Sequence, residues 1–461
     1  MPMPALAGGR HGAQELRPLV EVVLSALAEG ARSRGGVVPA GGPEAVAASV
    51  KETLGEALPR DGRGEREALY TLVRLLAAGA VDPAEPHCVG HLHCPPLAVA
   101  TAADLAVSAL NPSLDSWDQA PAAGELETRV TAALAALAYP DLPAPDALVT
   151  TGGTESNQLA LLLARERAAG GPRLQVVCGA SAHHSVRRAA WLLGLPSPLV
   201  IDTPAGLLDP AAVAAALDEL PVRALVVATA GTTDTGAIDP LPEIAAATAR
   251  HRAELHVDAA YGGPLLFSER EAGKLDGLQS AVSVTLDLHK LGWQPVAAGL
   301  LAVPDGAALR PLNHRADYLN AADDTDAGLP DLLGRSLRTT RRPDILKAAV
   351  TLRALGREGM AALVDRVCDS ARELADKVDR HPALVLYGRP AISTVLFRPR
   401  DADDEQIAGL RRRLMYEGRA VFGRARAGGR TWLKATVLNP YLRPEDLDAL
   451  LQLTTEGPTA R

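Results

Sequence analysis

The sequence predicts an α/β fold in which helices cover a large, mostly parallel sheet. From Ala147 onward, short β-rich runs alternate with helical stretches, and this alternation is typical of α/β units. The chain has 461 residues, of which 47% are hydrophobic, so it can bury a large core. The expected strands are Leu174–Cys178, Pro198–Ile201, Ala224–Ala228, Glu254–Val257, Val282–Leu286 and Ala298–Val303.

Both ends of the chain differ from this central pattern. Helical apolar spacing recurs over Leu16–Ala28, Pro43–Leu58 and Arg66–Ala78. After a polar loop, Asn320–Arg335, the expected order is a long helix, two strands, a helix, a strand and a last helix: Asp344–Val378, Leu384–Tyr387, Ser393–Phe397, Glu405–Tyr416, Trp432–Leu438 and Pro444–Leu453. We therefore expect a helical dimerisation arm (1–79), a large domain (80–343) and a small α+β domain (344–461).

Composition and charge narrow the possible partners. The net charge of −8 comes without any basic block that would follow a phosphate backbone, so nucleic acid is not an expected partner. The first residues lack the apolar core of a signal peptide, and no apolar run is long enough to span a membrane. We expect a cytoplasmic protein whose four cysteines are reduced.

Lys290 is the first candidate catalytic residue. It closes the stretch Ser283–Lys290, where apolar residues give way to polar ones. The carboxyl ends of parallel strands are where α/β folds build ligand sites, and an amine held there can attack a carbonyl carbon. The alternative is an ordinary solvated lysine at a strand end.

Asp258 ends the β-rich run before that of Lys290, so we expect both side chains at one edge of the sheet. A carboxylate at this place suits a site for a protonated pyridine ring, because its charge keeps the ring nitrogen protonated. Taken alone, Asp258 is also compatible with a helix cap or a metal ligand.

Two further signals indicate a flat, phosphorylated ligand. The stretch Thr150–Asn157 is a glycine turn that opens the helical run Gln158–Ala169, and free backbone N–H groups at such a helix start bind phosphate. The same pattern is also an ordinary helix N-cap. His183 follows another β-rich run, where an imidazole can stack on a flat ring, although a lone histidine is more often structural.

Together these residues suit the binding of pyridoxal phosphate. The motifs that contain them resemble those of the group II pyridoxal-phosphate decarboxylases. That family includes aromatic-amino-acid, glutamate, diaminobutyrate and siderophore-pathway lysine decarboxylases. The resemblance runs from about His87 to Pro440 and includes Ala228–Thr233, Gly236–Pro240 and Arg341–Lys347. It implies the type I, aspartate-aminotransferase-like fold, and an obligate homodimer with the active site at the subunit interface.

The resemblance also implies roles for single residues. Lys290 matches the lysine that forms a Schiff base with pyridoxal 5'-phosphate, Asp258 matches the partner of the ring nitrogen, and His183 matches the stacking histidine; these are the expected catalytic residues. The other expected cofactor-binding residues are Gly153 and Thr154 at the phosphate, Thr233 near cofactor and substrate, Ala260 under the ring, His289 beside the phosphate, and Asp287, which is asparagine in some relatives.

The implied reaction converts an L-amino acid to its amine through Schiff-base and quinonoid intermediates. Aligned through Trp117, Asp115 falls where aromatic-amino-acid decarboxylases present a phenylalanine to the substrate. We therefore expect a basic diamino acid, such as 2,4-diaminobutyrate, ornithine or lysine, and a diamine product. His93 and Cys94 are expected to face the ligand or the dimer partner. The alternatives are that Asp115 caps a turn or pairs with an arginine, and that the substrate is an aromatic or other amino acid.

One departure from the family concerns the final proton transfer. Aromatic-amino-acid members carry a tyrosine on a mobile loop, but the stretch Ala321–Arg335 contains none, and Tyr318 just before it matches a different position. The proton donor is therefore unassigned, with His183 and a water as candidates. A decarboxylation-dependent aldehyde synthase is an alternative for the same reason.

Two other classes of function are alternatives to the decarboxylase. The segment His87–Cys94 has the residue types of a zinc site, although we expect no metal. A non-catalytic binding protein on the same fold has little reason to keep the lysine, the acid and the phosphate turn together.

Overall fold

A computed structural model of the protein describes residues 3–456 except 169–173, 222, 314–315 and 317. The outer ends of the predicted arm and of the predicted C-terminal domain lie outside the described residues, as does Ala169 at the end of a predicted helical run.

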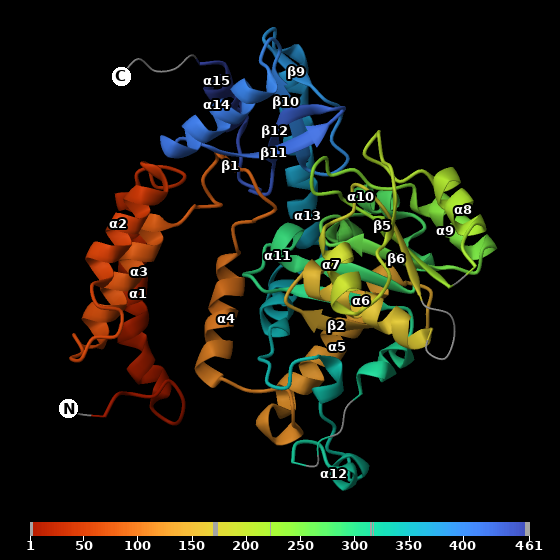
Figure 1. The fold of residues 1–461 in the computed structure, drawn as a ribbon. Coiled ribbons are helices and arrows are strands. Elements are labelled where there is room, and N and C mark those ends of the chain that lie inside the picture. The colour runs from red at the N-terminus through yellow and green to blue at the C-terminus, as the bar shows by residue number, and fades with distance from the viewer. Residues whose placement is uncertain (1–2, 169–173, 222, 314–315, 317, 457–461) are drawn as a thin grey trace.

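Among the described residues, seven strands form one central sheet, the large sheet, in the order β2-β8-β7-β6-β5-β3-β4 (Figure 1). β8 runs antiparallel to both of its neighbours, and the other pairs are parallel. β5 and β7 are buried over their whole length, as expected for strands covered on both faces. The strands are β2 Asp146–Thr150, β3 Gln175–Gly179, β4 Leu199–Ile201, β5 Ala224–Thr229, β6 Glu254–Ala259, β7 Ser283–Asp287 and β8 Gly299–Val303. The predicted α/β fold is confirmed.

Helices cover the large sheet with apolar side chains. One buried cluster joins α6 (Gly153–Arg167) and α7 (Ser185–Leu192) to β3 and β5. A larger cluster joins the sheet to α5 (Pro121–Ala138), α9 (Leu241–Arg250) and α13 (Ile345–Arg380). The other helices of this part are α4 Ala98–Leu110, α8 Pro210–Asp218, α10 Glu269–Ala272, α11 Leu288–Leu291 and α12 Ala322–Asp326. α12 lies inside the predicted polar loop.

A second, small sheet stands at the C-terminal end of the fold (Figure 1). In the described chain it has the order β1-β11-β12-β10-β9, and β1 pairs with β11 in parallel. Its elements are β1 Cys88–Val89, β9 Leu384–Leu386, β10 Thr394–Pro399, β11 Val421–Ala427 and β12 Arg430–Thr436, flanked by α14 Asp404–Tyr416 and α15 Pro444–Thr455. β1 and β11 were not predicted, and the proposed division at residues 79 and 343 stays a prediction.

The N-terminal arm consists of helices α1 (Gly12–Arg34), α2 (Gly42–Leu54) and α3 (Glu65–Gly79). Figure 1 shows it along one side of the molecule, away from the large sheet. Backbone hydrogen bonds tie its connecting loop to the end of α14, from Val37 N–H to the Gly418 carbonyl at 3.0 Å. Large apolar side chains of the arm stay exposed: Leu24, Leu27, Val50, Leu54, Leu58, Leu72 and Leu76. None of the described helices is long and apolar enough to cross a membrane.

A buried ion pair fixes the segment before α13 to α5. The Arg341 guanidinium donates to both carboxylate oxygens of Glu127, at 2.8 and 2.5 Å, and each side chain is only 2% exposed. Two parallel hydrogen bonds of this kind hold the charges in one geometry. Removing one partner would leave the other charge buried and unpaired.

We predict that Glu127→Ala destabilises the protein by about 3 to 5 kcal/mol, because Arg341 keeps its buried charge. Urea unfolding followed by circular dichroism measures the change. Glu125→Ala is the matched control on the same helix, since its ion pair with Arg129 is exposed at 62% and 77%, and exposed pairs contribute under about 1 kcal/mol. Equal midpoints for the two variants would contradict the prediction.

Candidate active site

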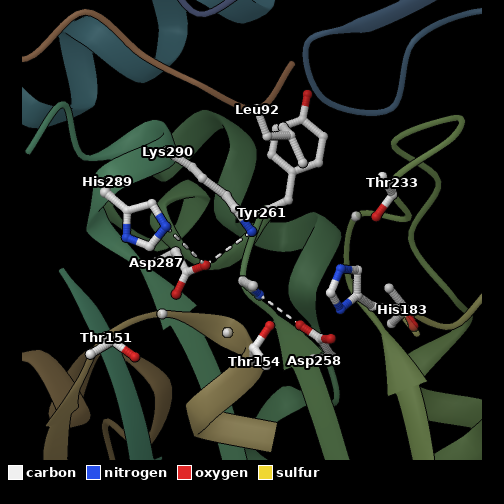
Figure 2. A pocket seen from close by; sticks show the side chains of 15 residues that line it. Leu92, Thr151, Thr154, His183, Thr233, Asp258, Tyr261, Asp287, His289 and Lys290 are labelled. Atoms are coloured by element: carbon white, nitrogen blue, oxygen red, sulfur yellow. Dashed lines mark hydrogen bonds and ion pairs between the residues drawn. The ribbon is translucent and has the colours of Figure 1, made fainter. Parts of the chain in front are cut away.

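A cavity of about 240 Å³ lies at the carboxyl ends of β5, β6 and β7 (Figure 2). The structure brings all the predicted cofactor-binding residues to its lining: Gly153, Thr154, His183, Thr233, Asp258, Ala260, Asp287, His289 and Lys290. Leu92, Thr151, Gly152, Thr229, Gly231 and Tyr261 also line the cavity and were not named as site residues from the sequence.

Lys290 stands on α11, the short helix that follows β7. Figure 2 shows Lys290 and His289 both directed at Asp287. The Asp287 carboxylate lies 2.9 Å from Lys290 Nζ and 3.5 Å from His289 Nε2 through its Oδ2 atom. Its Oδ1 atom is buried and has no hydrogen-bond partner among the described residues. One oxygen of this buried carboxylate is therefore available to a further donor.

Asp258 lies across the cavity from Asp287, near the end of β6 (Figure 2). Its Oδ1 atom accepts a hydrogen bond from the Ala260 backbone N–H at 3.1 Å, and its Oδ2 atom accepts one from Asn157 Nδ2 at 2.7 Å. The side chain is almost fully removed from water. These two donors hold the carboxylate in one orientation toward the cavity.

The glycine turn brings main-chain atoms, with no side chain on them, to the cavity. Gly152 has φ +144°, and a Cβ atom there would stand 2.9 Å from His289 Cε1. A Cβ atom on Gly153 would stand 2.9 Å from that of Ala260. Helix α6 begins at Gly153, and no described side chain caps its first turn. The turn therefore presents free N–H groups and the positive end of the helix dipole to an anion.

The two histidines of the cavity are both shifted toward the neutral form. Burial lowers the pKa of His183, against the charge of Asp258, which raises it. Burial also lowers the pKa of His289, against the nearby charge of Asp287. Since the usual histidine pKa is about 6.5, both imidazoles are neutral at pH 7.

Comparison with known proteins identifies the family. Residues 48–400 match the model of the pyridoxal-dependent decarboxylase conserved domain. The chain belongs to this family. It is 42% identical over 419 residues to the L-2,4-diaminobutyrate decarboxylase of Rhizobium meliloti (strain 1021), covering 88% of this chain and 84% of that protein. The corresponding enzyme of Acinetobacter baumannii is 32% identical over 428 residues, covering 85% and 84%.

A solved structure supports the same assignment. The glutamate decarboxylase domain of diaminobutyrate-pyruvate transaminase and L-2,4-diaminobutyrate decarboxylase from Vibrio parahaemolyticus has a TM-score of 0.86 and 31% identity, covering 98% of this chain and 96% of that one. The protein is thus a pyridoxal-phosphate-dependent amino-acid decarboxylase with the type I fold, which confirms the resemblance found in the sequence.

The cavity of the decarboxylase fits pyridoxal phosphate on its own chemistry. The uncapped start of α6 and the space that a Cβ atom would fill at Gly152 and Gly153 suit a phosphate. The buried carboxylate of Asp258 suits a ring nitrogen that carries a proton. Lys290 supplies a primary amine between these two ends.

The predicted substrate-binding residues do not line this cavity. Leu92 faces it instead of His93, which is exposed. Cys94 is buried behind His289, where its Sγ donates to the His289 carbonyl at 3.2 Å, and burial raises the pKa of its thiol to about 12. Asp115 is buried before a short 3₁₀ turn (Trp117–Gln119), and its Oδ1 accepts from Gln119 Nε2 at 2.9 Å. Their substrate roles stay predictions.

Tyr318 and Tyr261 are the two tyrosines to compare with the loop tyrosine that the stretch Ala321–Arg335 lacks. Tyr318 is 83% exposed. Tyr261 lines the cavity, but its hydroxyl bonds to Ser393 and Thr394, and burial raises its pKa to about 12. The signal for Tyr261 was its place three residues after Asp258 at the same strand end.

The zinc alternative gains no geometric support. Within the described residues, no group of three or more histidine, cysteine, aspartate or glutamate side chains could hold a metal ion. The segment His87–Cys94 instead runs through β1 and past the cavity.

We predict that Gly152→Ala weakens pyridoxal-phosphate binding by at least about 10-fold, because its backbone conformation and the His289 ring leave no room for a Cβ atom. Titration of the apoenzyme by absorbance gives the dissociation constant. Gly194→Ala is the control, since Gly194 also has a positive φ (+63°) but no atom within 4 Å of its Cβ position. An unchanged constant for Gly152→Ala would show that the turn does not face the cofactor.

Proposed function

We propose that this enzyme decarboxylates an L-amino acid with a cationic side chain, with L-2,4-diaminobutyrate as its first substrate, and releases the diamine. The observation that carries the proposal is the 42% identity, over 88% of the chain, to an enzyme of that name. The scarcity of aromatic side chains, at 3% of residues, agrees with it because little is available to build an aromatic slot.

In this proposal the residues of the cavity divide the work. Lys290 binds the cofactor covalently, and Asp258 holds a proton on its ring nitrogen. His183 stacks on the ring, and the turn at Gly153 and Thr154, with His289, holds the phosphate, while Asp287 pairs with Lys290 and His289. Thr233 and Ala260 lie next to the ring and the substrate. When bound, the cofactor draws electrons from the bond to the carboxyl carbon, so that carbon dioxide can leave.

The reaction consumes one proton, because the carbon that loses carbon dioxide gains a hydrogen. His183 and a water are the candidate sources, since the stretch Ala321–Arg335 offers no tyrosine. His183 is neutral at pH 7, and giving up its proton would leave an imidazolate. This favours water as the source, with His183 orienting the reacting groups.

We propose a homodimer in which a second copy covers the exposed apolar faces of α1–α3. Apolar patches of this extent are costly in water. We also propose that the same copy completes the site, with Asp115, which lies outside its own cavity, facing the cavity of the partner subunit and pairing there with the cationic end of the substrate.

The cellular setting is also a proposal. We place the enzyme in the cytoplasm, where the four unpaired cysteines stay reduced. Its diamine product would supply diamine or siderophore biosynthesis, as the sequence resemblance implies.

We predict that Lys290→Ala abolishes decarboxylation, because this is the lysine whose amine lies with the other cofactor groups in the cavity. In the wild-type enzyme, borohydride reduction followed by peptide mass spectrometry should place the cofactor on Lys290. Lys434 is the informative rival, because it is buried and its Nζ donates to the Thr233 carbonyl. An adduct on Lys434 would overturn the assignment.

We predict that Asp115→Asn lowers kcat/KM for 2,4-diaminobutyrate by about 30-fold or more, because the substrate cation loses its buried partner. Asp118→Asn, at the exposed end of the same segment, is the control. The assay covers a panel of amino acids with the amines identified by mass spectrometry. Faster turnover of tyrosine, DOPA or glutamate than of every diamino acid would refute the substrate but not the reaction.

Co-expression tests whether Asp115 acts across the dimer. A heterodimer of Lys290→Ala and Asp115→Asn chains carries both defects in one site and none in the other. The mixture should therefore regain about one quarter of wild-type activity. If Asp115 acts within its own subunit, no intact site forms and activity stays at the level of the two variants.

A further inference from the structure

Asn157 is the centre of a buried hydrogen-bond network behind the cavity. It is fully buried on the second turn of α6 and does not line the cavity. Its amide nitrogen donates to Asp258 Oδ2 at 2.7 Å and to Ser185 Oγ at 2.8 Å. Its amide oxygen accepts from Thr285 Oγ1 at 3.0 Å. Asp258 is a carboxylate and can only accept, so the nitrogen of Asn157 must face it.

The orientation of Asn157 fixes the hydroxyl of Ser185. Both N–H groups of the amide are used, one for Asp258 and one for Ser185, so the Ser185 oxygen acts as an acceptor. Its own hydrogen then points to its other neighbour, His183 Nδ1, at 2.8 Å. The Ser185 backbone N–H also points to His183 Nδ1, at 3.3 Å. His183 Nδ1 thus meets two donors and must carry a lone pair.

His256 lies on the other side of the Asn157 amide. His256 is fully buried, and burial lowers its pKa to about 4, so it is neutral. Its Nε2 lies 3.0 Å from the oxygen of Asn157, and its Nδ1 lies 2.8 Å from Ser283 Oγ. Its Nδ1 also lies 3.1 Å from the Ser283 carbonyl oxygen, which can only accept, so the contacts of His256 fit a proton on either ring nitrogen. The direction of the network therefore rests on Asp258 and Thr285, which face the nitrogen and the oxygen of Asn157.

We propose that Asn157 and Ser185 are positioning residues that fix neutral His183 with its proton on Nε2, so that the imidazole presents an N–H group to the cavity. Nε2 has no hydrogen-bond partner among the described residues, and His183 lines the cavity. The Asp258 carboxylate orients the Asn157 amide, which donates to Ser185, and Ser185 in turn donates to His183. The carboxylate that faces the ring nitrogen therefore also sets the proton of the stacking histidine.

The consequence for the site is a defined hydrogen-bond donor beside the bound substrate. His184 packs against the His183 ring with centroids 4.1 Å apart, which further limits rotation of the imidazole. With the opposite tautomer, Nε2 would direct a lone pair at the carboxylate of an amino acid and repel it. The inference rests on the proposed function only in that an amino acid binds on this side of the cavity.

The test uses one variant that reverses the network and one that breaks it. In Asn157→Asp the new side chain has the shape of asparagine but at most one O–H group. That group donates to the charged Asp258 carboxylate. The Ser185 hydroxyl then donates to residue 157, and its oxygen accepts a hydrogen bond from an N–H group on His183 Nδ1. We predict a loss in kcat of about 100-fold for Asn157→Asp and of about 10-fold for Ser185→Ala, in which the hydrogen bonds of the hydroxyl with Asn157 and His183 are lost. Cofactor affinity of Ser185→Ala should stay within about 3-fold of wild type.

The double variant gives the decisive comparison. Without the Ser185 hydroxyl nothing pulls the His183 proton to Nδ1, so Asn157→Asp with Ser185→Ala should be several-fold faster than Asn157→Asp alone. A merely structural role predicts the reverse, since two defects in one buried cluster destabilise more than one. A double variant as slow as Asn157→Asp, or slower, would overturn the proposal.

Neutron diffraction on crystals of the cofactor-free wild-type protein provides a readout that does not depend on activity or on Asn157→Asp folding. Deuterium on His183 Nε2 is expected, and deuterium on Nδ1 would overturn the proposal. Because this measurement needs neither cofactor nor substrate, its failure is distinct from failure of the proposed function, which the amino-acid panel tests.

Discussion

The Asp258 carboxylate is held out of water, and the structure around it is arranged to make that possible. An ionised carboxylate in a buried place is costly unless donors surround it. Asp258 lies on β6, and the strand register places it between Thr229 of β5 and Thr285 of β7. α6 brings Asn157 beneath it, and the turn after β6 adds the Ala260 N–H. The same α6 begins at the glycine turn, so the acid and the anion-binding end of the cavity are set by one helix.

Much of the fold follows from local sequence patterns, and the exceptions have a physical cause. The buried parallel strands are continuous apolar runs, which is why their ends could be predicted closely. β11 was missed because Gly423 and the four arginine and alanine residues after it hide the alternation of apolar and polar side chains. Gly423 is small for a reason that only the tertiary structure shows: a Cβ atom there would stand 2.4 Å from the Gly90 carbonyl. β1, with two residues, is a strand only through its parallel pairing with β11.

The residues of the site were predictable for the same physical reason. The predicted cofactor residues sit at strand ends or on the glycine turn, and a parallel sheet brings such positions together whatever the connecting loops do. The segment around His93 is irregular, so no period tells which side chain turns inward, and the structure selects Leu92. Asn157 was visible in the glycine-turn motif, but its role depends on partners that lie far away in the sequence. Asp115 was chosen by its place in a motif, and in the structure it is buried outside the cavity beside Gln119.

The pairing of β1 with β11 has a consequence for how the chain is made. β1 leaves the ribosome early, whereas β11 is synthesised close to the end of the chain. The large sheet can form while β1 still has no partner, because all of its strands lie between these two. The small sheet therefore closes only after synthesis is nearly complete, and contacts between such distant segments form slowly. During that interval the backbone groups of β1 have no strand partner, and such unpaired groups can pair with another unfinished chain.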